Sequence, residues 1–207
     1  MSGQSIDNVI FDIGNVLIRW EPEQLYRRMF PDDAAIHAFY VETGLLTHNI
    51  ELDRGEPFAV VLADLAAKHP HHAEALHAFN HRWPETVVGD IPETVAMLQE
   101  LRARRVPNYA ITNFSREKFD VALEMFPVLR GFDGIVVSAD VRMVKPDPAI
   151  FRVLLDRHQL NPARSLFIDD NADNIATART LGLATHHFAG PAALRRDLVA
   201  RGLLRAQ

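Results

Sequence analysis

Short, almost unbroken runs of β-branched and aromatic residues recur along this chain, and segments with helical periodicity separate them. Runs without a polar alternation are typical of strands buried on both faces, as in a parallel sheet covered by helices. Strands that alternate with helices favour βαβ units. We therefore expect an α/β fold with a doubly wound, Rossmann-like parallel sheet. The predicted strands cover residues 8–12, 109–112, 134–138, 165–169 and, with the weakest pattern, 185–188.

Helices are predicted between these strands and after the last one. Apolar residues recur at helical spacing over 91–101 and over 150–155. A third helix is expected over 171–181, because Gly182 supplies a typical C-terminal stop. A fourth is expected over 191–201.

Residues 21–88 interrupt this alternation, because they contain no convincing strand. Four apolar residues from Phe58 to Leu65 repeat at i, i+3, i+4 and i+7, which predicts an amphipathic helix. We interpret 21–88 as an all-helical cap subdomain inserted in the loop after the first strand, and residues 1–20 and 89–207 as the α/β core domain. The other helices expected in the cap cover 22–29, 32–41 and 73–83.

The composition excludes several classes of function. The chain has 22 Lys and Arg against 27 Asp and Glu, a net charge of −5, so no bulk attraction to nucleic acid or anionic membrane is expected. It has no cysteine, which excludes disulfides, thiolate catalysis, Cys-zinc sites and iron–sulfur clusters. Met1–Ser5 lacks the basic and apolar regions of a signal peptide, and no apolar run approaches the roughly 20 residues of a membrane span. We therefore expect a cytoplasmic protein, of open oligomeric state, that binds neither nucleic acid nor membrane.

Chemically useful side chains follow four of the predicted strands. Functional groups gather at the carboxyl ends of the strands in a parallel α/β sheet, so we expect these side chains to share one cleft. Each alone has a structural explanation, such as a helix N-cap, but the four together are a much stronger signal. They are Asp12, Thr112 with Asn113, Lys145, and Asp169 with Asp170.

The charges of these residues favour a metal ion and phosphoryl transfer. Three carboxylates in one cleft repel one another, since two unit charges about 4 Å apart repel by roughly 4 kcal/mol at an effective dielectric constant of 20. Lys145 supplies one positive charge, and a hard divalent cation such as Mg²⁺ fits the oxygen ligands that remain. A carboxylate can attack phosphorus, while the cation, the lysine and Thr112 stabilise the phosphoryl oxygens.

Four segments resemble, in order, the four motifs of the haloacid dehalogenase superfamily. They cover residues 9–17, 111–113, 144–147 and 167–171. The helical insert lies where one large branch of that superfamily carries its cap. The Asp-x-Gly-Asn-Val start and the Asp-Asp-Asn-Ala-Asp-Asn-Ile run are most similar to the glucose-1-phosphatase-like members. The resemblance implies a Mg²⁺-dependent phosphatase acting on a small phosphorylated metabolite, with a sugar phosphate as one option.

The resemblance also implies roles for single residues. Asp12 is the implied nucleophile and a metal ligand, and the backbone carbonyl of Gly14 is a second ligand. Asp170 is the implied metal ligand from the fourth motif. Asp169 beside it is implied to bind the metal either directly or through a water molecule. The residues implied to hold the phosphoryl group are Thr112, Asn113 and Lys145, and those implied in catalysis are Asp12, Lys145 and Thr112.

One position departs from the family pattern. Phosphatases of this superfamily usually carry a second Asp two residues after the nucleophile, as general acid and base, and here that residue is Gly14. General acid–base catalysis commonly contributes about 10²- to 10⁴-fold. A cap residue, a water molecule or the substrate itself could replace the acid, and Glu21 and His48 are the two cap residues considered. A slow enzyme, or one that prefers a good leaving group, is the expected consequence.

Two other functions could use the same residues. A 2-haloacid dehalogenase also uses an Asp nucleophile, here Asp12, but this nucleophile attacks carbon and the reaction needs no metal. Without a metal ion, the negative charges of the acidic pair beside Asp12 would be unfavourable. The first motif of dehalogenases also differs, because it has an aromatic residue at the position of Gly14. A catalytically silent phospho-acceptor or binding module is the second alternative. Receiver domains work in this way, but their acidic pair comes from the first strand, whereas here it comes last.

Three further features receive structural interpretations. We interpret the histidines in 69–72 as a solvated loop before a helix in preference to a metal site. Trp20 and Trp83 are expected to pack at the hinge and in the cap. The segment 53–55, Asp-Arg-Gly, is predicted to be a turn between cap helices, although its charges could face the cleft.

Overall fold

A five-stranded parallel sheet forms the centre of the protein. The computed structural model describes residues 5–206, so the first four residues, where no signal peptide was predicted, lie outside the described part. The strand order is β5-β4-β1-β6-β7, and all neighbouring strands are parallel. The five strands predicted from the sequence are confirmed. They are β1 Asn8–Phe11, β4 Asn108–Thr112, β5 Gly134–Val137, β6 Ser165–Asp169 and β7 Ala184–His187.

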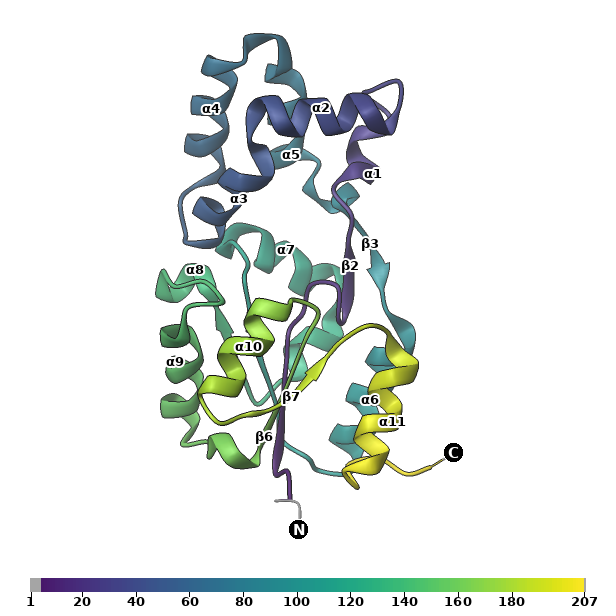
Figure 1. Cartoon of the computed structure of the whole chain (residues 1–207). Helices are drawn as coiled ribbons and strands as arrows, with labels where there is room; N and C mark the ends of the chain where they lie inside the picture. The colour runs from purple at the N-terminus through teal and green to yellow at the C-terminus, as the bar shows by residue number, and fades with distance from the viewer. Residues whose placement is uncertain (1–4, 207) are drawn as a thin grey trace.

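Helices cover both faces of this sheet, which confirms the doubly wound fold (Figure 1). Successive strand residues point to opposite faces. Ile10 accordingly belongs to one apolar cluster with Phe151 of α9, while Phe11 belongs to another with Leu98 of α6 and Leu194 of α11. None of the helices in residues 5–206 is both long and apolar enough to cross a membrane. The four helices predicted here are confirmed as α6 Pro92–Ala103, α9 Pro148–His158, α10 Ala172–Thr180 and α11 Pro191–Ala200.

A group of helices lies beyond the carboxyl ends of the parallel strands (Figure 1). Two short antiparallel strands, β2 (Ile18–Trp20) and β3 (Val87–Asp90), lead the chain into this group and out of it. We refer to the segment between them as the helical insert, and its assignment as a cap subdomain remains our proposal. Its helices are α1 Glu23–Tyr26, α2 Asp33–Thr43, α3 Leu45–Asp53, α4 Phe58–Lys68 and α5 Ala73–His81.

The insert differs from the sequence prediction in its details. Strands β2 and β3 were not predicted, because strands of three and four residues are too short to show an alternation. Helix α1 ends at Tyr26 and not at Met29, because the backbone N–H groups of Met29 and Phe30 both donate to the Tyr26 carbonyl and close a turn there. Helix α3 was not predicted, and it begins directly after Gly44, whose left-handed φ of 64° separates it from α2.

An aromatic cluster fixes the short helix α1 inside the insert. The Tyr26 ring is fully buried, with its centroid 4.9 Å from that of Phe39 and 5.5 Å from that of Tyr40, both on α2. Its hydroxyl donates to the Ala75 carbonyl of α5 at 3.2 Å. An isolated helix of four residues is not stable in water, so α1 owes its conformation to this packing.

The remaining elements of the core complete the layer around the site. Helix α7 (Arg116–Met125) follows β4, and its N-cap Ser115 accepts a hydrogen bond from the Lys118 N–H at 3.3 Å. The short helix α8 (Ser138–Val141) follows β5 directly. Short 3₁₀ helices cover η3 Pro127–Gly131 and η4 Pro162–Arg164 in the core, and η1 Pro70–His72 and η2 Trp83–Thr86 in the insert.

Candidate active site

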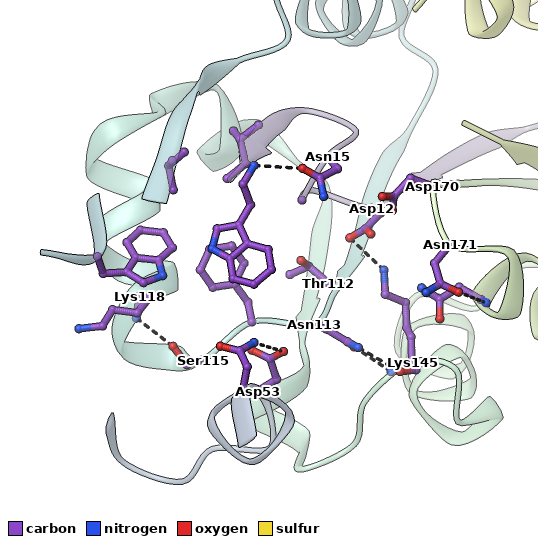
Figure 2. A pocket seen from close by; sticks show the side chains of 18 of the residues that line it. Asp12, Asn15, Asp53, Thr112, Asn113, Ser115, Lys118, Lys145, Asp170 and Asn171 are labelled. Atoms are coloured by element: carbon purple, nitrogen blue, oxygen red, sulfur yellow. Dashed lines mark hydrogen bonds and ion pairs between the residues drawn. The ribbon is translucent and has the colours of Figure 1, made fainter. Parts of the chain in front are cut away.

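A cavity of about 280 Å³ lies where the loops after β1, β4 and β6 meet the helical insert (Figure 2). Such a position, outside the carboxyl ends of parallel strands, is where α/β proteins bind ligands. Asp169 does not line the cavity and lies fully buried behind it. The other residues predicted for the site all line the cavity: Asp12, Gly14, Thr112, Asn113, Lys145 and Asp170.

The register of the sheet brings these residues together. Phe11, the last residue of β1, pairs with Ala110 of β4 and with Ile168 of β6. The backbone N–H of Asp12 then donates to the Ile168 carbonyl at 2.8 Å. The residue after β1 therefore lies level with the last residue of β6, Asp169, although more than 150 positions separate them in the chain.

Lys145 lies between two carboxylates. Its Nζ is 2.9 Å from Asp12 Oδ1 and 2.7 Å from Asp169 Oδ2, and its side chain is almost completely buried. Burial alone lowers the pKa of Lys145, but the charges of Asp12 and Asp169 outweigh it and hold that pKa above its usual value. Lys145 therefore stays charged and supplies the positive charge predicted from the sequence.

The carboxylate of Asp12 is held through one oxygen. Oδ1 accepts from the Ile13 N–H at 2.7 Å and contacts Lys145 Nζ, whereas these contacts leave Oδ2 free. Burial raises the pKa of Asp12 to about 7; the Lys145 charge opposes this rise and the Asp169 charge adds to it. The arrangement fixes the orientation of the side chain and keeps one oxygen available for chemistry.

Asp169 has its oxygens occupied by protein donors. Oδ1 accepts from the Asn171 N–H at 2.8 Å, and Asn174 Nδ2 lies 3.0 Å from both oxygens. Oδ2 also contacts Lys145. We therefore assign Asp169 to the positioning of Lys145 in preference to direct contact with a metal, a choice that the sequence left open.

The acidic residues of the site fit a divalent cation. Asp12, Asp169 and Asp170 offer carboxylate oxygens that lie within 4.8 Å of one another. Burial raises the pKa of the half-buried Asp170, the Asp169 charge adds to this rise, and the Lys145 charge opposes it. An all-oxygen donor set suits Mg²⁺. We propose Asp12, Asp170 and the Gly14 carbonyl as the ligands.

Thr112 and Asn113 close the site at the end of β4. The Thr112 side chain lines the cavity and is 1% exposed. The Asn113 side chain is bonded to the backbone of Lys145 at both of its polar ends, at 2.7 Å and 3.0 Å. We propose that Asn113 positions Lys145, in addition to the phosphoryl contact implied by the resemblance.

The helical insert and strand β2 contribute wall residues that the sequence did not assign to the site. Asp53 and Asn49 of α3 line the cavity, together with the aromatic side chains of Trp20, Phe58 and Trp83. The two tryptophans were predicted to pack, and both do so: Trp83 has its ring 5.6 Å from that of Phe114, and the partly buried Trp20 packs against the core cluster to which Trp83 belongs. Their place on the wall depends on how the insert sits over the sheet, for which no local pattern gives a signal.

The two residues considered as a replacement acid do not line the cavity. Glu21 accepts a hydrogen bond from Gln24 at 3.1 Å, and His48 Nδ1 lies 2.9 Å from Glu51. Asp53, from the segment predicted as a turn with charges that could face the cleft, is the acidic side chain of the insert on the wall. Asp53 is therefore the candidate proton donor that the insert presents to the cavity.

Lys118 connects the core to the insert beside the cavity. Its Nζ donates to the Asn80 side chain at 2.6 Å and to the Asn80 carbonyl at 3.1 Å, and it lies 4.4 Å from the centre of the Phe58 ring. Burial lowers the pKa of Lys118 below its usual value. The contacts join α7 to α4 and α5 and fix this wall of the cavity.

The histidine tract forms a separate polar cluster on the insert. His71 Nε2 and His72 Nε2 lie 2.7 Å and 3.1 Å from the Glu42 carboxylate, whose pKa these contacts hold below its usual value. His71 and Glu42 are exposed. The tract forms the 3₁₀ helix η1 in place of the predicted loop, and the side chains of His69 and His72 are only 24% and 16% exposed. Glu42, His71 and His72 also bring ligand atoms within 4.8 Å of one another, so the preference for a solvated segment over a metal site stays a prediction.

Comparison with known proteins places the chain among hydrolases. A family model for haloacid dehalogenase-like hydrolases matches residues 6–182. A sesquiterpene phosphatase from Aspergillus oryzae is 31% identical over 93 residues, which cover 45% of this chain and 47% of the relative. The pyrophosphatase PpaX from Bacillus velezensis is 26% identical over 108 residues, which cover 52% of this chain and 50% of the relative. The matches therefore span about half the length of these curated relatives.

A solved structure shares the fold over most of its length. An HAD family enzyme from Bacteroides thetaiotaomicron, in complex with magnesium and inorganic phosphate, superposes with a TM-score of 0.67 at 21% identity, covering 88% of this chain and 93% of that one. At this identity the likeness shows the fold, and the family model, which matches most of the chain, shows the family. The chain belongs to the haloacid dehalogenase-like hydrolases.

Proposed function

We propose that this hydrolase is a Mg²⁺-dependent phosphatase that cleaves a small phosphorylated metabolite through an aspartyl-phosphate on Asp12. The asymmetry of the Asp12 carboxylate carries the proposal. Oδ1 is bound by Ile13 and Lys145, and among residues 5–206 no hydrogen bond or ion pair engages Oδ2, which lies beside the other acidic residues of the site. Phosphatase relatives and a fold neighbour with magnesium and phosphate support the same reaction class.

The reaction has two displacements at phosphorus. In the first, Asp12 Oδ2 forms a bond to phosphorus while the bond to the leaving oxygen breaks, and that oxygen takes up a proton. In the second, water attacks the aspartyl-phosphate and loses a proton, releasing inorganic phosphate and restoring Asp12. Lys145 and Thr112 stabilise the phosphoryl oxygens in both steps. Bound Mg²⁺ supplies further positive charge to these oxygens.

The side chains on the wall of the cavity determine which leaving group fits the site. Apolar and aromatic side chains from the insert, from strands β2 and β3 and from the loop after β4 line part of this wall, and they favour a leaving group with apolar surface. The sugar phosphate raised by the resemblance is more polar and would instead have to pair with polar wall residues such as Asn49, Asp53 and Lys118. We propose that the substrate has an aromatic or long aliphatic leaving group. Glucose 1-phosphate is the sugar phosphate whose hydrolysis is compared with it. The apolar residues concerned are Ile18, Trp20, Phe58, Trp83, Val87 and Phe114.

Release of inorganic phosphate from a panel of phosphate monoesters tests the proposal. The panel contains phenyl, naphthyl, long-chain alkyl and sugar phosphates, each assayed with Mg²⁺ and with EDTA. We expect Mg²⁺-dependent release that Asp12→Asn abolishes. Equal activity in Asp12→Asn refutes the proposal. Chloride release from 2-chloropropionate in EDTA would assign a dehalogenase instead, and a stable phosphoprotein without phosphate release would assign a phospho-acceptor.

A further inference from the structure

The site lacks an acid where its family relatives usually carry one. Gly14, two residues after Asp12, has no side chain, and a Cβ placed there would meet no atom within 4 Å. An alkoxide is a poor leaving group at neutral pH, so breaking the bond to an alkyl oxygen needs a proton donor. In an in-line displacement the leaving oxygen lies opposite the attacking Asp12 oxygen. The donor is therefore expected on the insert side of the cavity.

Asp53 is an acidic side chain on that side of the cavity. It is the last residue of α3 and lines the same cavity as Asp12. Figure 2 shows the two carboxylates at different edges of the pocket, with Thr112 between them in the view. Asn49 Nδ2 donates to Asp53 Oδ2 at 3.1 Å, which fixes the orientation of the carboxyl group.

The backbone at Asp53 is attached to the core, although the residue belongs to the insert. Ser138 Oγ, at the start of α8, donates to the Asp53 carbonyl at 2.6 Å. Gly55 has a φ of +99°, and a Cβ there would lie 3.0 Å from the Ala139 carbonyl oxygen. This close approach requires glycine. The turn after α3 thus holds Asp53 in a defined position relative to the sheet.

The surroundings of Asp53 favour a carboxyl group that keeps its proton near neutral pH. Burial raises the pKa of Asp53 to about 7, against the opposing effects of the Lys145 charge and of hydrogen bonds from Asn49 and the Ser115 backbone. A group with a pKa close to the working pH is well suited to give and take protons. The other charged groups on the cavity wall are Asp12, Asp170, Lys118 and Lys145.

We propose that Asp53 is the general acid and base of this site. The inference rests on the proposed function. As the bond between phosphorus and the leaving oxygen breaks, the Asp53 carboxyl group gives its proton to that oxygen, which leaves as the alcohol. The Asp53 carboxylate then accepts a proton from the water that attacks the aspartyl-phosphate. Each turnover therefore returns both Asp12 and Asp53 to their starting forms.

A comparison of two leaving groups tests this role. Butyl phosphate releases an alkoxide that needs a proton, whereas 4-nitrophenyl phosphate releases a phenolate that does not. The quantity kcat/KM reports the first displacement for both substrates. We expect Asp53→Asn to lower kcat/KM for butyl phosphate about 10²- to 10⁴-fold and that for 4-nitrophenyl phosphate by less than about tenfold. An equal loss for both substrates overturns the proposal, because a structural role would affect both alike.

A second variant asks whether an acid at the family position restores the activity. Gly14 has room for a side chain, and its φ lies outside the left-handed region. Asp53→Asn combined with Gly14→Asp is therefore expected to recover butyl phosphate hydrolysis. Asp140→Asn is the charge-matched control, since Asp140 is an exposed acid that pairs with Arg116 at 3.1 Å. It is expected to leave both kcat/KM values unchanged.

The ratio of the two kcat/KM values decides the role of Asp53 even if a variant folds poorly, because a loss of folded protein lowers both values by the same factor. Failure of the proposed function has a different signature. In that case the wild-type protein releases no phosphate from either substrate, or Asp12→Asn is as active as wild type, and the role of Asp53 falls with the function.

Discussion

Asn113 and Lys145 are joined by a reciprocal pair of hydrogen bonds: the Lys145 N–H donates to Asn113 Oδ1 at 2.7 Å, and Asn113 Nδ2 donates to the Lys145 carbonyl at 3.0 Å. The pair connects the end of β4 with the loop after α8. It fixes the backbone from which the Lys145 ammonium reaches Asp12 and Asp169. The amide side chain of the second motif therefore positions the charged side chain of the third.

Replacement of Asn113 by Ala is expected to reduce catalysis through Lys145. Both backbone groups of Lys145 lose their partner, and a displacement of about 1 Å in a catalytic group can cost about 10²-fold in rate. We predict a loss of about that size in kcat/KM, measured with 4-nitrophenyl phosphate. Asn161→Ala is the control, because Asn161 caps the distant helix η4. Unchanged activity in Asn113→Ala contradicts the positioning role.

The sequence predicted the core and its site well because the relevant signals are local. Each strand of the parallel sheet is a compact apolar run, and each functional residue of the core comes directly after such a run or in the following loop. Asp12 and Asp170 could therefore be placed in one cleft from the strand ends alone. The separate roles of the site residues could not be predicted in this way. The hydrogen bonds that occupy Asp169, for example, come from Lys145 and Asn174, and the spacing of these residues in the sequence does not indicate them.

The wall of the site that comes from the insert could not be predicted in this way. Asp53 reaches the cavity because Ser138, 85 positions away, binds its carbonyl. Trp20 lies on a strand of three residues whose partner, β3, follows the whole insert. These contacts arise from the packing of distant segments, and no periodicity in either segment encodes them. The substrate preference and the proton donor are therefore the features that needed the structure.

Replacement of Lys145 by Met tests the buried charge pair. Its Nζ lies within 3 Å of two carboxylates, and removal of one partner from a buried pair costs about 3–5 kcal/mol because it leaves an uncompensated charge. We predict a loss of that size in the free energy of unfolding by urea. Lys68→Met is the control, since Lys68 pairs with Asp64 on the exposed side of α4 and should cost at most about 1 kcal/mol. Equal stability of the two variants contradicts the interpretation.

Removal of the metal or of its proposed ligand is expected to abolish both activity and metal-dependent stabilisation. A ligand that binds the folded state at 100 times its Kd stabilises it by about 2.7 kcal/mol. We therefore predict that excess Mg²⁺ raises the Tm of the wild-type protein, that EDTA reverses the rise, and that Asp170→Asn eliminates it. Asp173→Asn, in the first turn of α10 and off the cavity wall, should respond to Mg²⁺ as the wild type does. A Mg²⁺ response that persists in Asp170→Asn contradicts the ligand assignment.

The activity toward poor leaving groups is expected to fall as the pH rises through about 7, because burial raises the pKa of Asp53 to about 7 and only the protonated form can donate. The Asp53 carboxyl group accepts hydrogen bonds from Asn49 and from the Ser115 backbone, and the Lys145 charge opposes the rise in its pKa. Above this pH, kcat/KM for butyl phosphate should decrease about tenfold per pH unit. The measurement is the ratio of this value to that for 4-nitrophenyl phosphate, since both substrates share the titration of the phosphate group. Asp53→Asn should make the ratio independent of pH, and a wild-type ratio that is already constant from pH 6 to pH 9 contradicts the role of this carboxyl group.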